Sequence, residues 1–394
     1  MRGIVEPEHD AQTGHCQAGP APVAQSTRRT FLRQALLMAL APLVASHARP
    51  AHAATTGAAT VDVRDKGAKG DGKTDDTWAI QDAIDALPEQ GGTVVVPAGH
   101  YMVDATQALR LRSNMILQLD PQATIEAIPN ARKRSHVIKV WRAANVEIRG
   151  GRVVGEREGH TGEGGEWGYG INIQASHNVK VSGTHISNCW GDGIWIGALG
   201  KGVFQVVSSD VTIENVVSTN NRRQGMSIGP CKRVRIIDCT FSDTHGTKPE
   251  SGIDLEPMAQ GPTRDVLIQR CTFTGNKGCG VEIHHNVEGV IVRDCTIEGN
   301  AGYGVYGKNV VDLWIDGNQI LDNGLVGIAL VKKTRDVRIT GNTVRRNSAR
   351  YVHHMLKSIK SIATGKPDKG DGKPRTEVRI DETTRNVTLS DNTF

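Results

Sequence analysis

The stretch Val211-Thr-Ile-Glu-Asn-Val216 decides how this chain folds, because close variants of it return along the sequence. Each copy alternates apolar and polar residues, which is typical of a short strand with one buried face. From Val211 onward the first five steps between copies are 23, 32, 24, 23 and 24 residues long. Short strands with a period in the twenties predict a solenoid of stacked coils. The copies begin at Val146, Val179, Val211, Val234, Val266, Val290, Leu313, Val337 and Val387.

The composition favours strands over helices. The chain has 394 residues, of which 38% are hydrophobic and only 4% aromatic, and it contains 45 glycines. These values argue against a transmembrane bundle, a coiled coil and a helix-rich enzyme. The copies also lack the leucine pattern of leucine-rich repeats, which share the period. We therefore predict an all-β fold, a right-handed parallel β-helix with about three short strands per coil.

A second repeated segment has the order glycine, apolar, variable, apolar, variable. Alternate side chains of a strand point to opposite faces, so we expect the apolar members to face the core and the variable members to face solvent. A third column holds Cys239, Cys271 and Cys295 and then Asn318 and Asn342, which we expect to be buried cysteines and an asparagine ladder. The second segment begins at Gly170, Gly193, Gly225, Gly252, Gly280, Gly304 and Gly327.

Residues 1–53 have the pattern of an export signal. Ser26-Thr-Arg-Arg-Thr-Phe-Leu32 resembles the twin-arginine signal, and Ala35–Ala45 is apolar but too short to span a bilayer. Ala51-His-Ala53 then offers small residues to a signal peptidase. We expect this segment to be removed, with no stable membrane insertion afterwards, and the mature protein to work in the periplasm or outside the cell.

The rest of the chain divides into a cap and the coils. Residues 54–103 do not follow the repeats and predict an N-terminal cap that contains one short helix. Residues 104–394 form the predicted β-helix, interrupted by a long loop at about 345–385. One face of the helix is expected to carry Trp78, Ile80, Ala83, Ile84 and Leu87.

The cap carries a family resemblance. Val63-Arg-Asp-Lys-Gly-Ala-Lys-Gly-Asp-Gly-Lys-Thr-Asp-Asp76 and Gly91-Gly-Thr-Val-Val-Val-Pro-Ala-Gly99 resemble the opening of pectate-lyase-superfamily β-helix proteins. This group includes polygalacturonase-like hydrolases, polysaccharide lyases and phage tailspikes. The resemblance implies a right-handed β-helix that acts on polysaccharide. The Gly-His-Gly and Arg-Ile-Lys motifs of polygalacturonases and the signatures of pectate lyases are absent, so no catalytic residue carries over by motif.

Stacking of the glycine segments predicts one surface patch that contains several acidic and basic side chains. Asp254, Glu282 and Tyr306 fall in one outward-facing row, and the neighbouring row holds Glu256, His284 and Lys308. Carboxylates this close disfavour joint ionisation, so one stays protonated beside an ionised partner, as glycoside hydrolysis requires. The three acidic residues could instead hold Ca²⁺, and then the histidine, phenol or ammonium group could serve proton abstraction in a β-elimination.

Groups suited to binding sugar flank this patch. Trp195 lies two coils before Asp254 in the same row, where its ring could stack on a sugar. Asp192 lies just before one column glycine and is expected to point toward the same groove. Arg222 and Arg223 could pair with a uronate carboxylate.

These patterns favour an exported enzyme that cleaves an acidic polysaccharide by carboxylate acid/base hydrolysis. A polysaccharide lyase, a uronate epimerase and a non-catalytic glycan-binding solenoid remain open. The net charge of +5 is small and no long basic run is present, so we expect no nucleic-acid partner. We expect no required cofactor, although calcium is an option, and a monomer or weak homo-oligomer.

Overall fold

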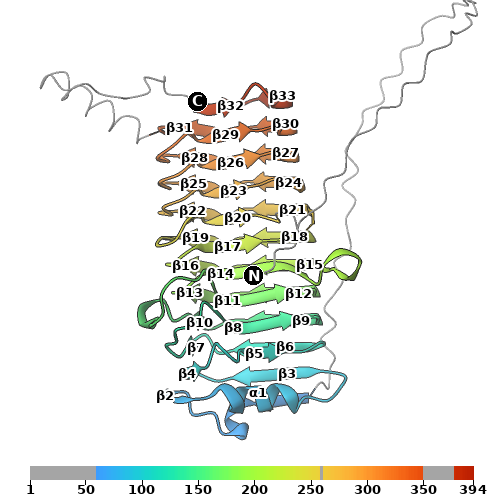
Figure 1. Cartoon of the computed structure of the whole chain (residues 1–394), viewed down its shortest axis with the longest axis vertical. Coiled ribbons are helices and arrows are strands. Elements are labelled where there is room, and N and C mark those ends of the chain that lie inside the picture. Colours follow the sequence, from blue (N-terminus) through green and yellow to red (C-terminus); the bar gives the residue numbers. More distant parts are fainter. Residues whose placement is uncertain (1–58, 258–260, 349–376) are drawn as a thin grey trace, which may run out of the picture. The chain divides into compact units, whose positions relative to one another are not determined.

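The computed structural model describes residues 59–257, 261–348 and 377–394, and these residues form a stack of coils (Figure 1). Successive strands of one coil lie on three faces, and each strand pairs in parallel with its counterpart in the next coil. The predicted all-β, right-handed parallel β-helix is confirmed, as are three strands per coil. The export signal expected in residues 1–53 lies outside the described residues.

The first face is built from the repeated phrase that begins at Val211. Val211 pairs with Val234, Val234 with Val266, and the register continues through Val290 to the last copy. The first face comprises β1 (Ala59–Asp62), β3 (Gly92–Val96), β6 (Met115–Leu119), β9 (Ala144–Arg149), β12 (His177–Ser182), β15 (Val206–Glu214), β18 (Cys231–Ile237), β21 (Thr263–Gln269), β24 (Val287–Arg293), β27 (Val311–Asp316), β30 (Arg335–Thr340) and β33 (Arg385–Ser390).

The second face follows a tight corner. Single residues with positive φ, such as Asn215, Asp238 and Asp294, turn the chain from the first face into the second. Asparagine and aspartate tolerate this left-handed conformation better than most residues. The second face comprises β2 (Asp71–Asp75), β4 (Gly99–Val103), β7 (Ala123–Ala127), β10 (Arg152–Val154), β13 (His185–Ser187), β16 (Val217–Thr219), β19 (Thr240–Ser242), β22 (Thr272–Thr274), β25 (Thr296–Glu298), β28 (Gln319–Leu321) and β31 (Thr343–Arg345).

The third face is built from the glycine segments and runs up the middle of Figure 1. It comprises β5 (Leu109–Leu111), β8 (Arg134–Trp141), β11 (Trp167–Gln174), β14 (Asp192–Leu199), β17 (Gln224–Ile228), β20 (Ile253–Leu255), β23 (Val281–Ile283), β26 (Val305–Lys308), β29 (Ile328–Val331) and β32 (Val378–Ile380). Strand β32 lies within the stretch predicted as a loop, much of which falls in residues 349–376, outside the described residues. Three of these strands, β8, β11 and β14, have eight residues each, whereas β20 and β23 have three.

Side chains inside the coils form continuous columns. Asn318 donates to Asn342, and Asn342 to Asn392, so the expected asparagine ladder is confirmed. The expected cysteine column is buried as well. A second ladder, which the sequence did not lead us to expect, runs through Asn300 and Asn323 at the corner that precedes the third face.

The N-terminal coil is covered by helix α1 (Thr77–Asp85), at the blue end of Figure 1. Ile80, Ala83, Ile84 and Leu87 are buried as expected. Trp78 is 55% exposed, so its expected place on the buried face is wrong. A side chain two positions before Ile80 lies about 200° away around a helix, and therefore points outward.

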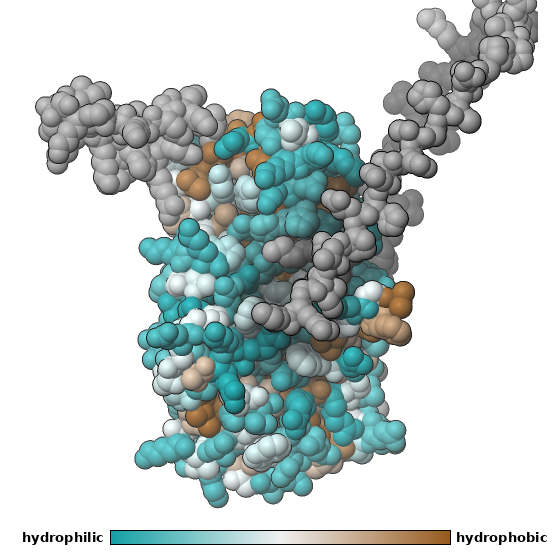
Figure 2. Space-filling model, viewed as in Figure 1, coloured by the Kyte–Doolittle hydropathy of each residue, from teal (hydrophilic) through white to brown (hydrophobic). Residues whose placement is uncertain are grey.

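Among the described residues there are also three short 3₁₀ helices, η1 (Val63–Lys66), η2 (Arg157–Gly159) and η3 (Gly202–Phe204). The third forms the tip of a hairpin in which the end of β14 pairs antiparallel with the start of β15. Val203 and Phe204 at this tip are exposed, and Figure 2 shows a hydrophobic patch there on an otherwise mostly hydrophilic face. Within the described ranges, no helix combines the length and hydrophobicity needed to cross a membrane.

Candidate active site on the third face

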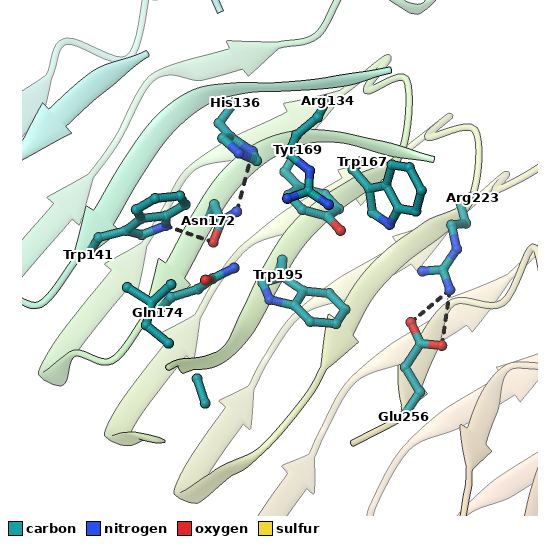
Figure 3. Close-up of a pocket in the computed structure, with 12 residues that line it drawn as sticks. Arg134, His136, Trp141, Trp167, Tyr169, Asn172, Gln174, Trp195, Arg223 and Glu256 are labelled. Atoms are coloured by element: carbon teal, nitrogen blue, oxygen red, sulfur yellow. Dashed lines mark hydrogen bonds and ion pairs between the residues drawn. The ribbon is translucent and has the colours of Figure 1, made fainter. Parts of the chain in front are cut away.

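The long strands β8, β11 and β14 and the β14–β15 hairpin create a cleft of about 360 Å³ on the third face (Figure 3). It forms here because these strands extend several residues beyond those of later coils, and the hairpin adds a wall. The lining is rich in aromatic and cationic side chains. It comprises Arg134, His136, Trp141, Trp167, Tyr169, Asn172, Gln174, Trp195, Ala198, Leu199, Arg223 and Glu256.

Aromatic rings follow one another along the cleft from coil to coil. The ring of Tyr169 lies between those of His136 and Trp195, with centroids 5.3 and 5.7 Å away and planes within 18° of parallel. Register explains the first of these contacts, because Tyr169 pairs with His136 in the adjacent coil. Trp195 pairs with Asn172, so its ring reaches Tyr169 diagonally across the two strands. The predicted row that joins Trp195 to Asp254 through Ser227 is also confirmed.

Two cations lie over the tryptophan rings at this end of the face. The Arg134 guanidinium is 5.1 Å from the Trp167 centroid, and the Lys139 ammonium is 4.8 Å from that of Trp141. Within the described residues, neither cation forms an ion pair with a carboxylate. Burial, and then the charges of Lys139 and Arg134, lower the pKa of His136 to about 3. The imidazole is therefore neutral, and its Nδ1 lies 3.3 Å from the amide nitrogen of Asn172.

At the other end of the cleft, Arg223 contacts the carboxylates of Glu166, Asp192 and Glu256, and we call these four residues the Arg223 network. Its guanidinium donates to both oxygens of Glu256 at 2.8 and 3.0 Å and approaches Asp192 at 3.2 Å and Glu166 at 3.3 Å. Asp192 is fully buried, and burial raises its pKa to about 7 against the opposing effect of Arg223. Asp192 does point toward Arg223 and the groove region, but it has no exposed surface.

The neighbouring Arg222 points elsewhere. Its guanidinium lies 3.8 Å from the centroid of the Trp190 ring and donates to the carbonyl oxygens of Gly165 and Trp190. It thereby ties the segment before β11 to the coil that carries β14. In the structure both arginines that we expected to meet a substrate carboxylate are bound to groups of the protein itself.

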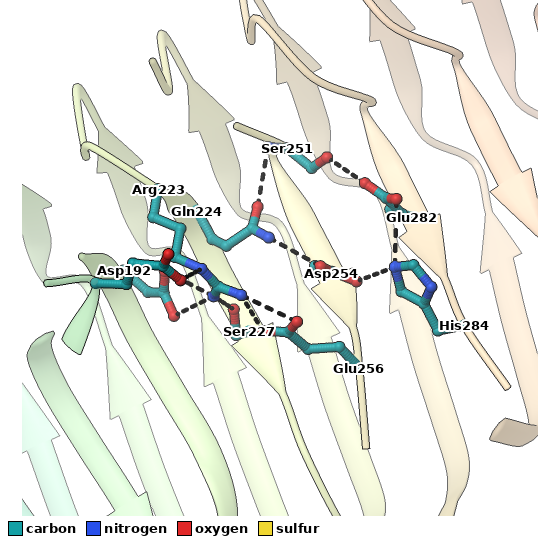
Figure 4. Close-up of polar contacts among 10 residues, drawn as sticks. Asp192, Arg223, Gln224, Ser227, Ser251, Asp254, Glu256, Glu282 and His284 are labelled. Atoms are coloured by element: carbon teal, nitrogen blue, oxygen red, sulfur yellow. Dashed lines mark hydrogen bonds and ion pairs between the residues drawn. The ribbon is translucent and has the colours of Figure 1, made fainter. Parts of the chain in front are cut away.

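One coil further on, Asp254, Glu282 and His284 meet (Figure 4). The Nε2 atom of His284 lies 3.2 Å from Glu282 Oε1 and 3.4 Å from Asp254 Oδ1. Asp254 and Glu282 are direct partners in adjacent strands, as predicted. We call these three residues the acid–imidazole cluster.

Two residues that the sequence analysis missed orient this cluster. Gln224 donates its amide to Asp254 Oδ2 at 2.8 Å and accepts from the backbone of Ser251. The Ser251 hydroxyl donates to Glu282 Oε2 at 2.7 Å. Gln224 and Ser251 each immediately precede the first glycine of a glycine segment, as Asp192 does. Asp192 pairs with Gln224 in adjacent strands, so aligning this position from coil to coil would have identified both residues from the sequence.

The two carboxyl groups of the cluster differ in their surroundings. Burial, and then the charges of Glu256 and Glu282, raise the pKa of Asp254 well above its usual value. Burial also raises the pKa of Glu282, but the hydrogen bonds from His284 and Ser251 outweigh it, so the pKa lies below its usual value. Burial thus favours the neutral form of Asp254, whereas the hydrogen bonds to Glu282 favour its ionised form.

The structure corrects the expectation that the predicted acids face solvent. Asp254 points away from the core, yet its side chain is completely buried, and that of Glu256 is only 9% exposed. Neighbouring coils supply the cover through Arg223, Gln224 and His284. The side chains of Glu282 and His284 keep 14% and 19% exposure and are the members of the cluster that solvent can reach.

The single patch expected from stacking is in fact divided. Glu256 pairs with Arg223. Within the described residues, the possible metal ligands that lie together are Asp254, Glu282 and His284, which differ from the expected calcium set of Asp254, Glu256 and Glu282. Tyr306 pairs with Glu282 in the next strand and stacks on Tyr303, with centroids 5.2 Å apart. Lys308 ends β26, and within the described residues it forms no ion pair.

Comparison with known proteins places the chain in a family. The model of the family described as "Rhamnogalacturonase A/epimerase, pectate lyase-like" matches residues 60–306, and a "Right handed beta helix region" matches residues 250–394. The first match includes the cleft, the Arg223 network and the acid–imidazole cluster. Polysaccharide-acting enzymes thus stand among the proteins that share this fold.

Two curated relatives match a large part of the chain. The SPbeta prophage-derived uncharacterized protein YorA of Bacillus subtilis is 29% identical over 64% of this chain and 48% of its own length. Uncharacterized protein YclG of the same organism is 29% identical over 71% of this chain and 54% of its own. The chain thus spans about half the length of these curated relatives.

A solved structure shares the fold. The A-module of mannuronan C-5 epimerase AlgE4 from Azotobacter vinelandii has a TM-score of 0.57 at 19% identity, covering 85% of this chain and 95% of the module. At this identity the likeness concerns the fold alone. Since the first family model covers well over half of the sequence, the chain belongs to the rhamnogalacturonase A/epimerase, pectate lyase-like family.

Proposed function

We propose that this chain is an enzyme that acts on an acidic, uronate-containing polysaccharide, with proton transfer at Glu282 and His284. One observation carries the proposal. A carboxylate, an imidazole and a buried carboxyl group are in contact on the same face as a cleft lined by aromatic rings and cations. General acid–base catalysis requires such groups within hydrogen-bond reach of one another and of the substrate.

The cleft supports an acidic glycan as substrate. Aromatic rings present apolar faces on which sugar rings stack. Arg134 and Lys139 add positive charge that no protein carboxylate neutralises within the described residues, and such charge attracts a polyanion. We therefore propose that Arg134 and Lys139 pair with the uronate carboxylates of the substrate, the role that the sequence suggested for Arg222 and Arg223. The twin-arginine-like segment Ser26–Leu32 and the apolar stretch after it are our reason to propose the periplasm or the cell exterior as the location.

The geometry of the cluster favours proton abstraction over hydrolysis. The potential ligand atoms of Asp254, Glu282 and His284 all lie within 4.8 Å of one another. Glycosidases place their two carboxyl groups about 5 to 9.5 Å apart, on either side of the scissile bond. Asp254 is also buried and cannot touch a leaving oxygen. A base that removes the proton beside a uronate carboxylate needs only one side of the sugar, and β-elimination and epimerisation share this step.

Hydrolysis is the second candidate. The observation that favours it is the position of Glu256, which lines the cleft itself and is separate from the cluster. Glu256 and Glu282 would then be the acid and base candidates. A non-catalytic glycan-binding solenoid would bind the glycan in the cleft, and neither Glu256 nor Glu282 would take part in a reaction.

One incubation of the full chain with polygalacturonate, alginate and a neutral glucan separates these functions. Elimination gives ultraviolet absorbance of an unsaturated uronate together with new reducing ends, and hydrolysis gives reducing ends alone. Epimerisation gives neither, but changes the proton NMR signals of the uronates. Glu282→Gln should abolish the reaction while glycan binding persists, and Glu298→Gln on the second face is the matched control. Binding without any product would contradict the proposed enzyme and support the glycan-binding solenoid.

A further inference from the structure

The acid–imidazole cluster contains a buried oxygen that accepts no hydrogen bond within the described residues. Asp254 Oδ2 accepts from Gln224, but Oδ1 has no hydrogen bond within the described residues although it is completely buried. Leaving such an atom unsatisfied costs about 1–3 kcal/mol, and more for a charged group. Oδ1 points toward His284, on the side where Glu282 also lies (Figure 4).

Two of the three spacings in the cluster match those of ligands on a single ion, and all three donor atoms lie within 4.8 Å of one another. His284 Nε2 lies 3.4 Å from Asp254 Oδ1 and 3.2 Å from Glu282 Oε1. Atoms bound at about 2.1 Å to one ion lie about 3.0 Å apart at right angles and about 3.4 Å apart in a tetrahedron. The second carboxylate oxygens are already held by Gln224 and Ser251, as the outer partners of metal ligands commonly are.

We propose that Asp254 Oδ1, Glu282 Oε1 and His284 Nε2 bind a divalent transition-metal ion. The donor set decides the class of metal. Calcium takes oxygen ligands, whereas an imidazole nitrogen beside two carboxylates suits ions such as Mn²⁺, Fe²⁺ or Zn²⁺. The partial exposure of Glu282 and His284 leaves room for water or another ligand on the open side of the ion.

This site has a consequence for the proposed reaction, and this consequence alone rests on the proposed function. The ion would take the Nε2 atom through which His284 contacts Glu282 and Asp254, so in an occupied site Nε2 has no proton to donate to either carboxylate. Metal occupancy and proton transfer at His284 therefore exclude each other, which would make the ion a regulator of the cluster.

Binding is tested on the full chain with Mn²⁺, which has little affinity for the buried thiols. Free Mn²⁺ gives a six-line electron paramagnetic resonance signal that is lost on binding. We expect one ion per chain, and electron spin echo modulation from a directly bound nitrogen. A tenfold excess of Ca²⁺ should leave most of the Mn²⁺ bound. Because no glycan is present, this result is independent of the proposed enzyme activity.

Variants identify the ligands. Glu282→Gln should weaken Mn²⁺ binding at least about tenfold, and His284→Gln should in addition remove the nitrogen modulation. His285 follows His284 in the chain but is not one of the three proposed ligands, so His285→Gln should leave Mn²⁺ binding and the nitrogen modulation unchanged. The proposal is overturned if the wild type binds no Mn²⁺, if Ca²⁺ displaces it readily, or if the modulation survives in His284→Gln.

Discussion

Removing the imidazole of His136 should make the protein less sensitive to acid. His136 is buried beside Lys139 and Arg134, and its pKa falls from 6.5 to about 3. The unfolded chain takes up a proton as the pH drops below about 6.5, whereas the folded chain does not until about pH 3. Protons therefore favour the unfolded state within this window, and stability is lost as the pH falls through it.

The size of the effect follows from the width of the window. Each pH unit below about 6.5 costs up to about 1.4 kcal/mol, so roughly 3 kcal/mol is lost between pH 6.5 and pH 4. His136→Gln keeps an acceptor for the amide of Asn172 but cannot take up a proton. The unfolding free energy of the wild type should fall by about 3 kcal/mol more than that of the variant across this range.

The assay is urea unfolding followed by circular dichroism at half-unit steps from pH 7 to pH 4. All other titrating groups are common to both proteins and cancel in the difference. His177→Gln, on the exposed part of the first face, is the matched control and should follow the wild type. If the wild type and His136→Gln lose stability in parallel, the desolvated, neutral state of His136 is wrong.

Three further predictions concern packing and binding. Arg223→Met leaves two buried carboxylates without their cation and should cost about 3–5 kcal/mol in denaturant unfolding, whereas Arg233→Met, at an exposed ion pair, should cost less than about 1 kcal/mol. Asn300→Ala breaks several side-chain bonds of the inner ladder and should lower the unfolding free energy by about 3 kcal/mol; a loss below about 1 kcal/mol would contradict the ladder's role. Trp195→Ala should weaken the binding of an acidic oligosaccharide about tenfold in calorimetry, while Trp314→Ala on the first face should not.

The rows of the third face show how far the sequence could predict the site. Aligning Gly252 with Gly280 places Asp254 against Glu282, and the structure has this pair. The prediction succeeds because parallel coils in register bring equivalent positions together at a strand spacing of about 4.8 Å. The same alignment joins Trp195 to the row of Asp254 through Ser227.

The exposure of these side chains could not be predicted in the same way. Strand alternation gives the direction of Asp254 but not what lies above it. Arg223 reaches Glu256 across 33 residues of sequence, and its long side chain has several rotamers that the pattern of the chain does not distinguish. Because Glu256 pairs with Arg223, its carboxylate is not part of the acid–imidazole cluster.

The sequence by itself determined the fold, its three faces and the adjacency of Asp254 and Glu282. These features depend on strand periodicity and on contacts between neighbouring coils, both of which a repeat displays directly. Only the tertiary structure decided where the cleft lies, that Asp254 is buried, and that His284 bridges it to Glu282 while Glu256 joins Arg223. Those outcomes depend on strand lengths, a protruding hairpin and the rotamers of long side chains, which vary from coil to coil and which no repeated pattern encodes.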